Sequence, residues 1–173
     1  MAIRQGFRSK VTARGYGMDI MGRFGKDGRV KLRSGRPLDW AFVAELAKQV
    51  FSVYGEYDRI LPTCLDDPQF HTLIIEENDC PAGFCMLSIG DGIGEVVAVA
   101  VDPLWQSRGF GKRLMNALVE DAQRMGIRLL VLKTAARNRI AQHLFRRVGF
   151  EKTIREEGYY TRGQSAIGMR KRL

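Results

Sequence analysis

Three segments of the chain place apolar residues at the spacing of an amphipathic helix. In residues 39–51 and 110–125 apolar side chains return every three or four positions, and Gly126 stands where a glycine often ends a helix. A third helix is expected to begin at Asn138 and to end at Gly149. The faces expected to be buried carry Phe42, Val43, Leu46, Ala47 and Val50 in the first helix, Leu114, Leu118, Ala122 and Met125 in the second, and Ile140, Ala141, Leu144, Phe145 and Val148 in the third.

Strand patterns occupy most of the remaining chain. Residues 29–33 can form a short strand, and residues 70–101 predict three strands because the turn signals ENDCP and GDG divide them. IRLLVLK, starting at Ile127, predicts a buried strand, and the last 24 residues predict a hairpin of FEKTIR with SAIGMRKRL. Residues 54–68 are expected to form a loop with a helical turn. This order of elements predicts an α/β domain with one central mixed, mostly antiparallel sheet flanked by helices.

The chain divides by charge into two parts. Its 173 residues suit one domain with a substantial core. Residues 1–36 hold ten Lys or Arg and two Asp, whereas the rest of the chain is nearly neutral, and the first 28 residues hold six glycines. We therefore expect a basic arm, residues 1–28, and a folded domain, residues 29–173. A solvated arm is favoured, and an arm that contacts RNA, the ribosome or an acidic partner is the alternative.

Cysteine spacing and hydropathy limit the class of protein. Cys64, Cys80 and Cys85 show no C-x-x-C spacing, which argues against a metal site or a disulfide framework and favours small buried side chains. No segment approaches the roughly 20 apolar residues that cross a bilayer, and the N-terminus lacks a signal-peptide pattern. We expect a soluble, cytoplasmic protein with no membrane partner, as a monomer or homodimer. Structural roles are expected for Trp40, His71, Trp105 and His143.

A glycine-containing loop, QSRGFG at residues 106–111, lies between a valine-rich strand and the start of a helix. Free backbone N–H groups and the positive helix end favour an anion at such a point. Gly109 and Gly111 remove the Cβ atoms that would keep a phosphate away from these groups. Positive side chains nearby are Arg108, Lys112 and Arg113. The loop is therefore a candidate phosphate site, with an ordinary strand-to-helix turn as the alternative.

Two common phosphate motifs do not describe this loop. A P-loop requires Ser or Thr after its lysine, but Lys112 is followed by Arg113, and a dinucleotide fingerprint requires a third glycine where Leu114 stands. The longer stretch VAVDPLWQSRGFGKRLMNAL, followed after one strand by NRIAQHLFRRVGF, resembles the GNAT superfamily of acetyl-CoA-dependent N-acetyltransferases. The loop matches the Q/R-x-x-G-x-G/A signature of that superfamily. The resemblance covers about residues 29–173 and is strongest over 95–150. A second block of the superfamily is matched by Asn138, Ala141, Leu144, Gly149 and Phe150.

The resemblance implies a site for acetyl-CoA as cosubstrate, without a metal. In GNAT proteins the loop cradles the pyrophosphate, and the preceding strand offers its main chain to the pantetheine arm. Carried over by position, the cofactor contacts are Val99, Ala100, Val101, Gln106, Ser107, Arg108, Gly109, Phe110, Gly111, Lys112, Arg113, Asn138 and Phe145.

The catalytic residues depart from those of relatives. The tyrosine that many relatives use as a general acid falls at Phe145, and the glutamate base of the ribosomal-protein N-terminal acetyltransferase branch falls at Lys133. Glu95 is the remaining candidate base, with a surface carboxylate as the alternative. The tail IREEGYYTRGQSAIGM resembles the ending of that branch, so Tyr159 or Tyr160, of which we favour Tyr160, can supply the missing hydroxyl; simple packing is the alternative.

The resemblance implies an acyltransferase that moves acetyl from acetyl-CoA to a primary amine by direct attack in a ternary complex. The acceptor is a protein N-terminus or another primary amine. The alternatives are a small-molecule amine or antibiotic acetyltransferase and a domain that binds acetyl-CoA without turnover. Nucleic acid is expected as a partner only through the basic arm.

Overall fold

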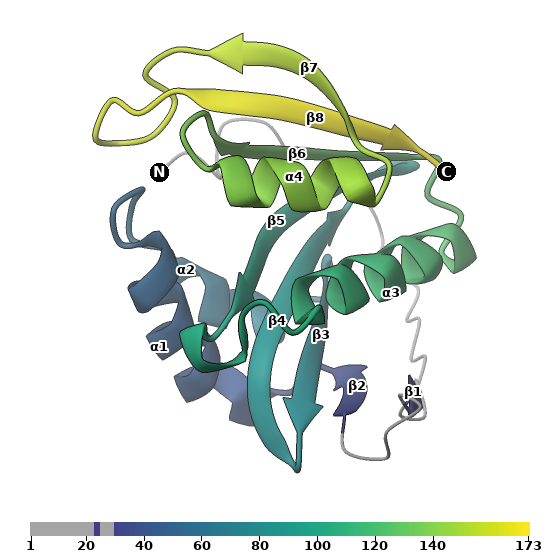
Figure 1. The fold of residues 1–173 in the computed structure, drawn as a ribbon. Helices are drawn as coiled ribbons and strands as arrows, with labels where there is room; N and C mark the ends of the chain where they lie inside the picture. Colours follow the sequence, from purple (N-terminus) through teal and green to yellow (C-terminus); the bar gives the residue numbers. More distant parts are fainter. Residues whose placement is uncertain (1–22, 25–29) are drawn as a thin grey trace.

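An eight-stranded sheet runs through the computed structural model, which describes residues 23–24 and 30–173 (Figure 1). The strand order is β1-β2-β3-β4-β5-β6-β8-β7, and every neighbouring pair is antiparallel except β5 and β6, which are parallel. The strands are β1 (Arg23–Phe24), β2 (Val30–Ser34), β3 (Phe70–Glu77), β4 (Cys80–Ile89), β5 (Ile93–Val101), β6 (Leu129–Ala135), β7 (Glu151–Glu156) and β8 (Ala166–Arg172). The mixed, mostly antiparallel sheet is confirmed.

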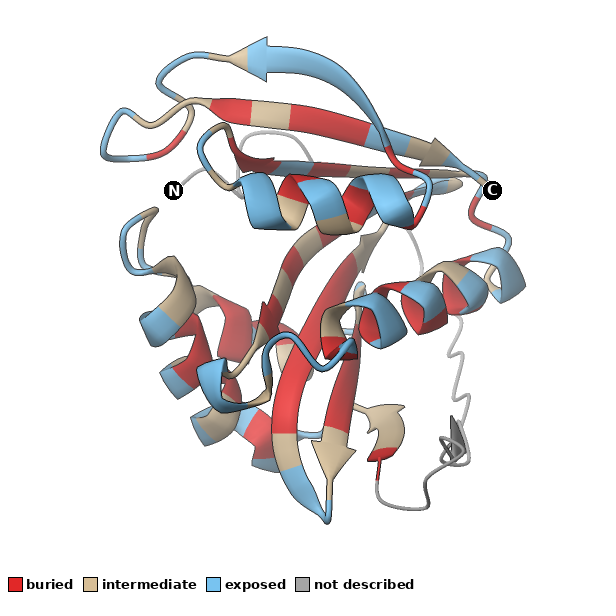
Figure 2. Ribbon diagram, viewed as in Figure 1, coloured by how far each residue is buried: buried red, intermediate tan, exposed pale blue. Residues whose placement is uncertain are grey.

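Helices cover both faces of the sheet. The α-helices are α1 (Trp40–Phe51), α2 (Tyr57–Ile60), α3 (Phe110–Arg124) and α4 (Arg139–Arg147), and the short 3-10 helices are η2 (Pro37–Asp39), η3 (Leu61–Leu65) and η4 (Pro103–Trp105). One core cluster joins α3 and α4 to the sheet, and a second joins α1 and η3 to it. Buried residues concentrate in the central strands and on the helix faces turned to them (Figure 2).

Alternation along the central strands divides the core between the two faces. Leu73 and Ile75 of β3 belong to the cluster with α3, whereas Ile74 between them belongs to the cluster with α1. Successive side chains of a strand point to opposite faces, so a run of apolar residues serves both helix layers at once. This explains why 70–101 shows nearly continuous hydrophobicity where it is buried on both sides.

Most predicted elements are present, with boundary shifts. β6 begins two residues later than expected and continues past Lys133 to Ala135. The inward position of Ile140 was wrong, because its side chain is 86% exposed, while Gln142 is buried. The Gln142 side-chain amide donates to the carbonyls of Ala135 (3.2 Å) and Ala136 (3.0 Å), and the Asn138 N–H also donates to the Ala135 carbonyl (2.9 Å). These hydrogen bonds satisfy the buried amide of Gln142 and hold it on the inward face of α4.

Some of the residues that were expected to have structural roles are buried, and others are exposed. Cys64 and Cys85 are buried as expected, but Cys80 is exposed, and Trp40 is 54% exposed and so is no packing anchor. His71 Nε2 lies 2.9 Å from Asp121 Oδ2 between β3 and α3. Burial, followed by the charge of Arg124, lowers the pKa of His71 to about 4, so its ring is neutral and donates to the carboxylate. The polar pair is thus a satisfied contact inside the core.

The expected arm, residues 1–28, lies outside the described residues except for Arg23–Phe24, which form β1. Over the described ranges, no helix is both long enough and apolar enough to cross a membrane. In the same part of the chain, no three His, Cys, Asp or Glu side chains gather as metal ligands would.

Candidate active site

β5 and β6 diverge part-way along their length. They pair in parallel only from Ile93 to Val96, which face Leu129 to Leu132. β5 continues with β4 as far as Val101, and β6 continues with β8 as far as Ala135. The edge of β5 that faces β6 therefore has no strand partner beyond Val96. A register irregularity against β4 falls at Val97, where the divergence begins.

The glycine loop connects the end of β5 to α3. Gly109, with φ 82°, is the residue before the helix, and Ser107 also has a left-handed φ of 62°. Alternating right- and left-handed residues turn successive N–H groups into one concavity, which suits an anion. Among the described hydrogen bonds, none uses the backbone N–H of residues 108–112. The 15-residue α3 adds the positive end of its dipole at the same place.

Side chains anchor the loop from outside. Gln106 Nε2 donates to the Val101 carbonyl at 2.9 Å, and Trp105 Nε1 donates to Glu77 Oε2 at 3.1 Å. Arg108 makes a two-pronged ion pair with Glu77 at 2.7 and 2.5 Å and lies 5.3 Å from the centre of the Phe110 ring. The guanidinium of Arg108 thus fixes the loop to the end of β3. An Arg108 side chain placed in this way contributes geometry more than free positive charge.

Glycine is required at positions 109 and 111 for different physical reasons. A Cβ on Gly109 would meet nothing within 4 Å, so only its left-handed backbone requires glycine. A Cβ on Gly111 would lie 3.2 Å from Leu144 Cδ2 and 3.9 Å from Val101 Cγ2. Gly111 therefore allows α3 to approach α4 and β5 closely. Lys112 and Arg113 are exposed and have no ion-pair partner among the described residues.

Tyrosines gather beside Ala135, the last residue of β6. Tyr160 is 9% exposed, and its ring centre lies 4.8 Å from that of Tyr54 and 5.0 Å from that of Tyr159. Burial, and then the neighbouring tyrosines, raise the pKa of Tyr160. Burial likewise raises the pKa of Tyr57 to about 12, with further contributions from Tyr159 and Glu95. These hydroxyl groups remain protonated at neutral pH and can donate protons.

Glu95 lies on β5 near these tyrosines. Its residue is exposed, but the surrounding protein shields the carboxylate enough to raise its pKa, while the charge of Lys133 opposes this shift. Lys133 Nζ lies 3.0 Å from the Glu156 carboxylate and 4.3 Å from the centre of the Tyr159 ring. Lys133 is therefore partly neutralised, and Glu95 has the raised pKa suited to a proton acceptor.

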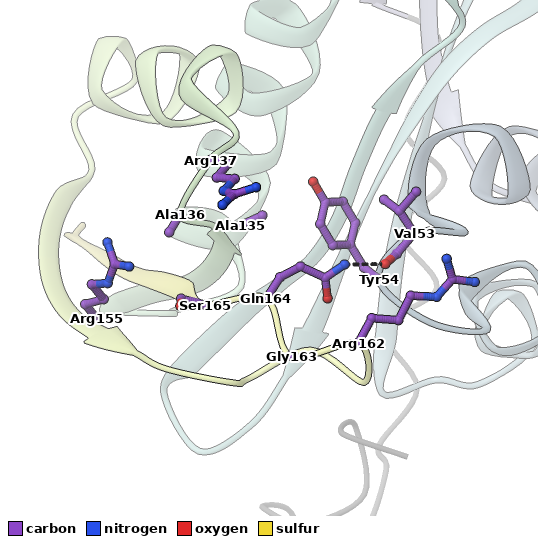
Figure 3. Close-up of a pocket in the computed structure, with 10 residues that line it drawn as sticks. All are labelled: Val53, Tyr54, Ala135, Ala136, Arg137, Arg155, Arg162, Gly163, Gln164 and Ser165. Atoms are coloured by element: carbon purple, nitrogen blue, oxygen red, sulfur yellow. Dashed lines mark hydrogen bonds between the residues drawn. The ribbon is translucent and has the colours of Figure 1, made fainter.

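A cavity of about 370 Å³ adjoins this tyrosine cluster (Figure 3). Its walls come from the connection after α1, the connection between β6 and α4, and the connection between β7 and β8. Gln164 Nε2 donates to the Val53 carbonyl at 2.7 Å, and Thr161 Oγ1 donates to the Tyr54 carbonyl at 3.2 Å, so the first and third walls are tied together. The lining residues are Val53, Tyr54, Ala135, Ala136, Arg137, Arg155, Arg162, Gly163, Gln164 and Ser165.

Comparison with known proteins identifies the fold and the family. The family model of the GNAT acetyltransferases matches residues 40–150. The chain belongs to the GNAT acetyltransferase family. It is accordingly an acyltransferase, as the sequence predicted, and the family uses acetyl-CoA.

Relatives of this GNAT acetyltransferase include enzymes of ribosomal-protein acetylation. A candidate ribosomal protein bS18-alanine N-acetyltransferase of Bacillus subtilis is 26% identical over 142 residues, covering 82% of this chain and 94% of that protein. The crystal structure of the ribosomal-protein-S18-alanine N-acetyltransferase from Escherichia coli has a TM-score of 0.75 at 20% identity, covering 83% of this chain and 94% of that one. The structure of a candidate acetyltransferase from Salmonella typhimurium with acetyl-CoA bound has a TM-score of 0.73 at 21% identity. The match covers 84% of this chain and 94% of that one.

The remaining predicted cofactor residues of this GNAT acetyltransferase line the diverging strands and α4. Val99 and Val101 are half-buried on β5, and Ala100 is buried on its opposite face among the residues of the α1 cluster. Asn138 caps α4, its Oδ1 accepting from the Ala141 N–H at 3.0 Å. Phe145 is buried, with its ring centre 6.0 Å from that of Phe150. Only the edge of β5 toward β6, not the side chain of Ala100, can face a ligand in the opening.

Sequence reasoning missed the arginines of the cavity. Arg137 lies in the β6–α4 connection, Arg155 on β7 and Arg162 in the β7–β8 connection, and no motif joins them. Their proximity depends on the folding of the β7–β8 hairpin next to the end of β6. The two tyrosines of the tail were the only signal in the sequence that this connection borders the site.

Proposed function

We propose that this acetyltransferase transfers an acetyl group from acetyl-CoA to the amine of a protein N-terminus. The observation that carries the proposal is the divergence of β5 and β6, which leaves one edge of β5 without a strand partner between Glu95 and the glycine loop. The unused N–H groups at the start of α3 follow the end of β5, and Glu95 precedes the divergence on the same strand, where its charge reaches Tyr57 and Tyr159. The similarity to ribosomal-protein alanine N-acetyltransferases supports a peptide acceptor.

The described residues fit acetyl-CoA. The N–H groups of residues 108–112 would hold the diphosphate, because they have no described partner and Gly109 leaves open space beside them. The main chain of Val99 and Val101 would bind the pantetheine arm, since that edge of β5 has no strand partner. The side-chain amide of Asn138 keeps its N–H₂ group for the same arm, because only its Oδ1 is used by the helix cap.

Glu95 would act as the base. An N-terminal amine has a pKa of about 8 and is mostly protonated at neutral pH, so one proton must leave before its lone pair can react. Acetyl-CoA supplies a thioester whose carbonyl carbon accepts that lone pair while the C–S bond breaks. Glu95 takes the proton, directly or through water, and its raised pKa makes the transfer easier than for an ordinary surface carboxylate.

Tyr160 would supply the proton that the departing thiolate takes up. Phe145 has no hydroxyl, whereas Tyr160 is buried and its raised pKa keeps its proton in place. The nitrogen loses a second proton as the amide forms, which restores the balance after donation. The acetyl group passes directly from sulfur to nitrogen while both substrates are bound in a ternary complex. This direct attack needs no nucleophile from the protein.

Calorimetry followed by an acceptor screen tests the proposal. Acetyl-CoA should bind the purified protein, and peptides with a free N-terminus should release CoA thiol and gain an acetyl group on the α-amine by mass spectrometry. The same peptides with a blocked N-terminus should not react. Turnover of small amines alone would indicate a small-molecule enzyme. Binding without any turnover would leave a binding domain, and a lack of binding would refute the site.

A further inference from the structure

The cavity beside the tyrosine cluster is cationic. Three of its ten lining residues are arginines, and none is Asp or Glu. Arg155 is paired with Glu157, Nε to Oε1 at 2.5 Å, and Glu157 also accepts from the Ser165 hydroxyl. Arg137 and Arg162 are exposed and have no carboxylate partner among the described residues. Two guanidinium groups therefore border this cavity with their hydrogen-bonding capacity to carboxylates unused.

The two arginines stand on different sides of the cavity. Figure 3 shows Arg137 on the side of the β6–α4 connection and Arg162 on the side of Val53. The wall between them includes Tyr54, whose ring contacts Tyr160. Ala135, at the end of β6, packs in one small cluster with Tyr160 and also lines the cavity. The cationic cavity is therefore directly connected to the residues proposed to meet the reacting amine.

The cavity is separate from the diphosphate loop. Its lining includes no residue of 106–113, and two of its walls are the connections after α1 and between β7 and β8. The hydrogen bonds from Gln164 and Thr161 hold these walls together at the tyrosine side of the opening. An anion bound here would thus belong to the molecule that enters from the acceptor side.

We propose that Arg137 and Arg162 bind acidic side chains in the first few residues of the acceptor peptide, so that the enzyme prefers acidic N-termini. This inference rests on the proposed N-terminal acetyltransferase function and adds its substrate class. Guanidinium groups bind carboxylates through two parallel hydrogen bonds, which gives both attraction and orientation. An extended peptide advances about 3.3–3.6 Å per residue, so positions after the reacting amine reach outward from Tyr54 into the cavity.

Three peptides that differ only at positions two and three test the preference. They begin Ser-Glu-Glu, Ser-Gln-Gln and Ser-Lys-Lys and share the rest of their sequence. With saturating acetyl-CoA, kcat/KM should be highest for the Glu peptide, about tenfold lower for the Gln peptide and lower still for the Lys peptide, since each partly exposed pair contributes about two- to fivefold. The difference should shrink as salt is added.

Arginine variants locate the effect. Arg137→Gln and Arg162→Gln should each lower the Glu-to-Gln ratio of kcat/KM, the double variant should bring it close to one, and Arg162→Glu should favour the Lys peptide. Arg147→Gln is the matched control, because Arg147 is exposed at the far end of α4 and does not line the cavity. It should keep the ratio of the unmodified enzyme. The dissociation constant of acetyl-CoA, measured for every variant, reports whether the fold and cofactor site remain intact.

A ratio near one in the unmodified enzyme, or a ratio that survives the double variant, would overturn the proposal. So would acetylation of free glutamate as efficiently as of the Glu peptide, because the acceptor would then be an amino acid. Binding of N-acetylated Glu and Lys peptides, by calorimetry with CoA present, needs no turnover. Tighter binding of the Glu product without catalysis would support the cavity and refute the proposed function, whereas equal binding would refute the cavity.

Discussion

Gly109 separates the proposed anion-binding role of the loop from its contribution to stability. Its φ of 82° is left-handed, and an added Cβ would meet no atom within 4 Å. Alanine at this position therefore strains the backbone alone, at about 1–2 kcal/mol. Gly126, just after the other end of α3, has a φ of 77° and equally open surroundings. Gly126→Ala is thus a control with the same backbone cost at a site remote from the loop.

Both alanine variants should lower the Tm by about 2–8 °C, because 1 kcal/mol shifts the Tm of a domain of this size by about 2–4 °C. Only Gly109→Ala should weaken acetyl-CoA binding. If the backbone relaxes to a negative φ, the N–H groups of the loop turn away from a common centre, and a loss of about 1.4 kcal/mol is already a tenfold rise in the dissociation constant.

Thermal unfolding with and without acetyl-CoA, together with calorimetry, measures both effects. S-acetyl-pantetheine lacks the diphosphate and should bind more weakly than acetyl-CoA. Its dissociation constant should be affected to the same extent by Gly109→Ala and by Gly126→Ala. If the Tm falls by the same amount in Gly109→Ala and Gly126→Ala, and both variants bind acetyl-CoA as tightly as the unmodified protein, the loop does not hold the diphosphate. A larger loss for S-acetyl-pantetheine in Gly109→Ala would also contradict the reasoning, because that probe makes no phosphate contact.

Three further predictions concern catalysis and packing. Below the raised pKa of Glu95, kcat/KM should fall about tenfold per pH unit, because protonated Glu95 cannot take the proton of the ammonium group; Glu95→Gln should lower the rate at neutral pH about 10²-fold or more and should move the start of the tenfold fall up to the pKa of the amine, about 8, in initial-rate profiles. Tyr160→Phe should lower kcat at least about tenfold with unchanged affinity for acetyl-CoA, whereas Tyr159→Phe should lower it less; equal effects would remove Tyr160 as the donor. Gly111→Leu should abolish acetyl-CoA binding in calorimetry and lower the Tm, because even a Cβ lies 3.2 Å from Leu144; unchanged binding would contradict close approach there.

The sequence predicted correctly those elements that are set by residues close together in the chain. α3 matches its predicted range to within one residue, because its apolar spacing and Gly126 act within the helix itself. The β3–β4 hairpin followed from its turn signal, where Asn78 and Asp79 both adopt positive φ. On the predicted inward face of α4 only Ile140 was wrong, and Gln142 is buried in addition to the predicted residues. Hydropathy favours the isoleucine, but the Gln142 amide donates to two carbonyls at the end of β6, which an isoleucine side chain cannot do.

The part of the candidate site that lies within one short stretch of the chain could also be predicted from the sequence. The glycine loop lies within one strand-to-helix connection, so its anion-binding character can be inferred from a short stretch. The partner of Arg108 could not, since Glu77 is 31 residues away and reaches the loop only because β3 ends beside it. The arginines of the cavity likewise meet through tertiary structure. Arg137 follows β6, and Arg162 lies in the β7–β8 connection.

The charges of the acceptor side form a gradient that favours one orientation of a peptide. Glu95 is the carboxylate whose charge reaches Tyr57 and Tyr159, so an ammonium group is attracted to the inner end of the opening. Arg137 and Arg162 line the adjoining cavity, where they repel a second positive charge and attract a negative one. A polyamine or a lysine-rich chain can satisfy the first preference but not the second. An N-terminus followed by acidic residues satisfies both, because its positive and negative groups are separated along the chain in the same order as their complements in the enzyme.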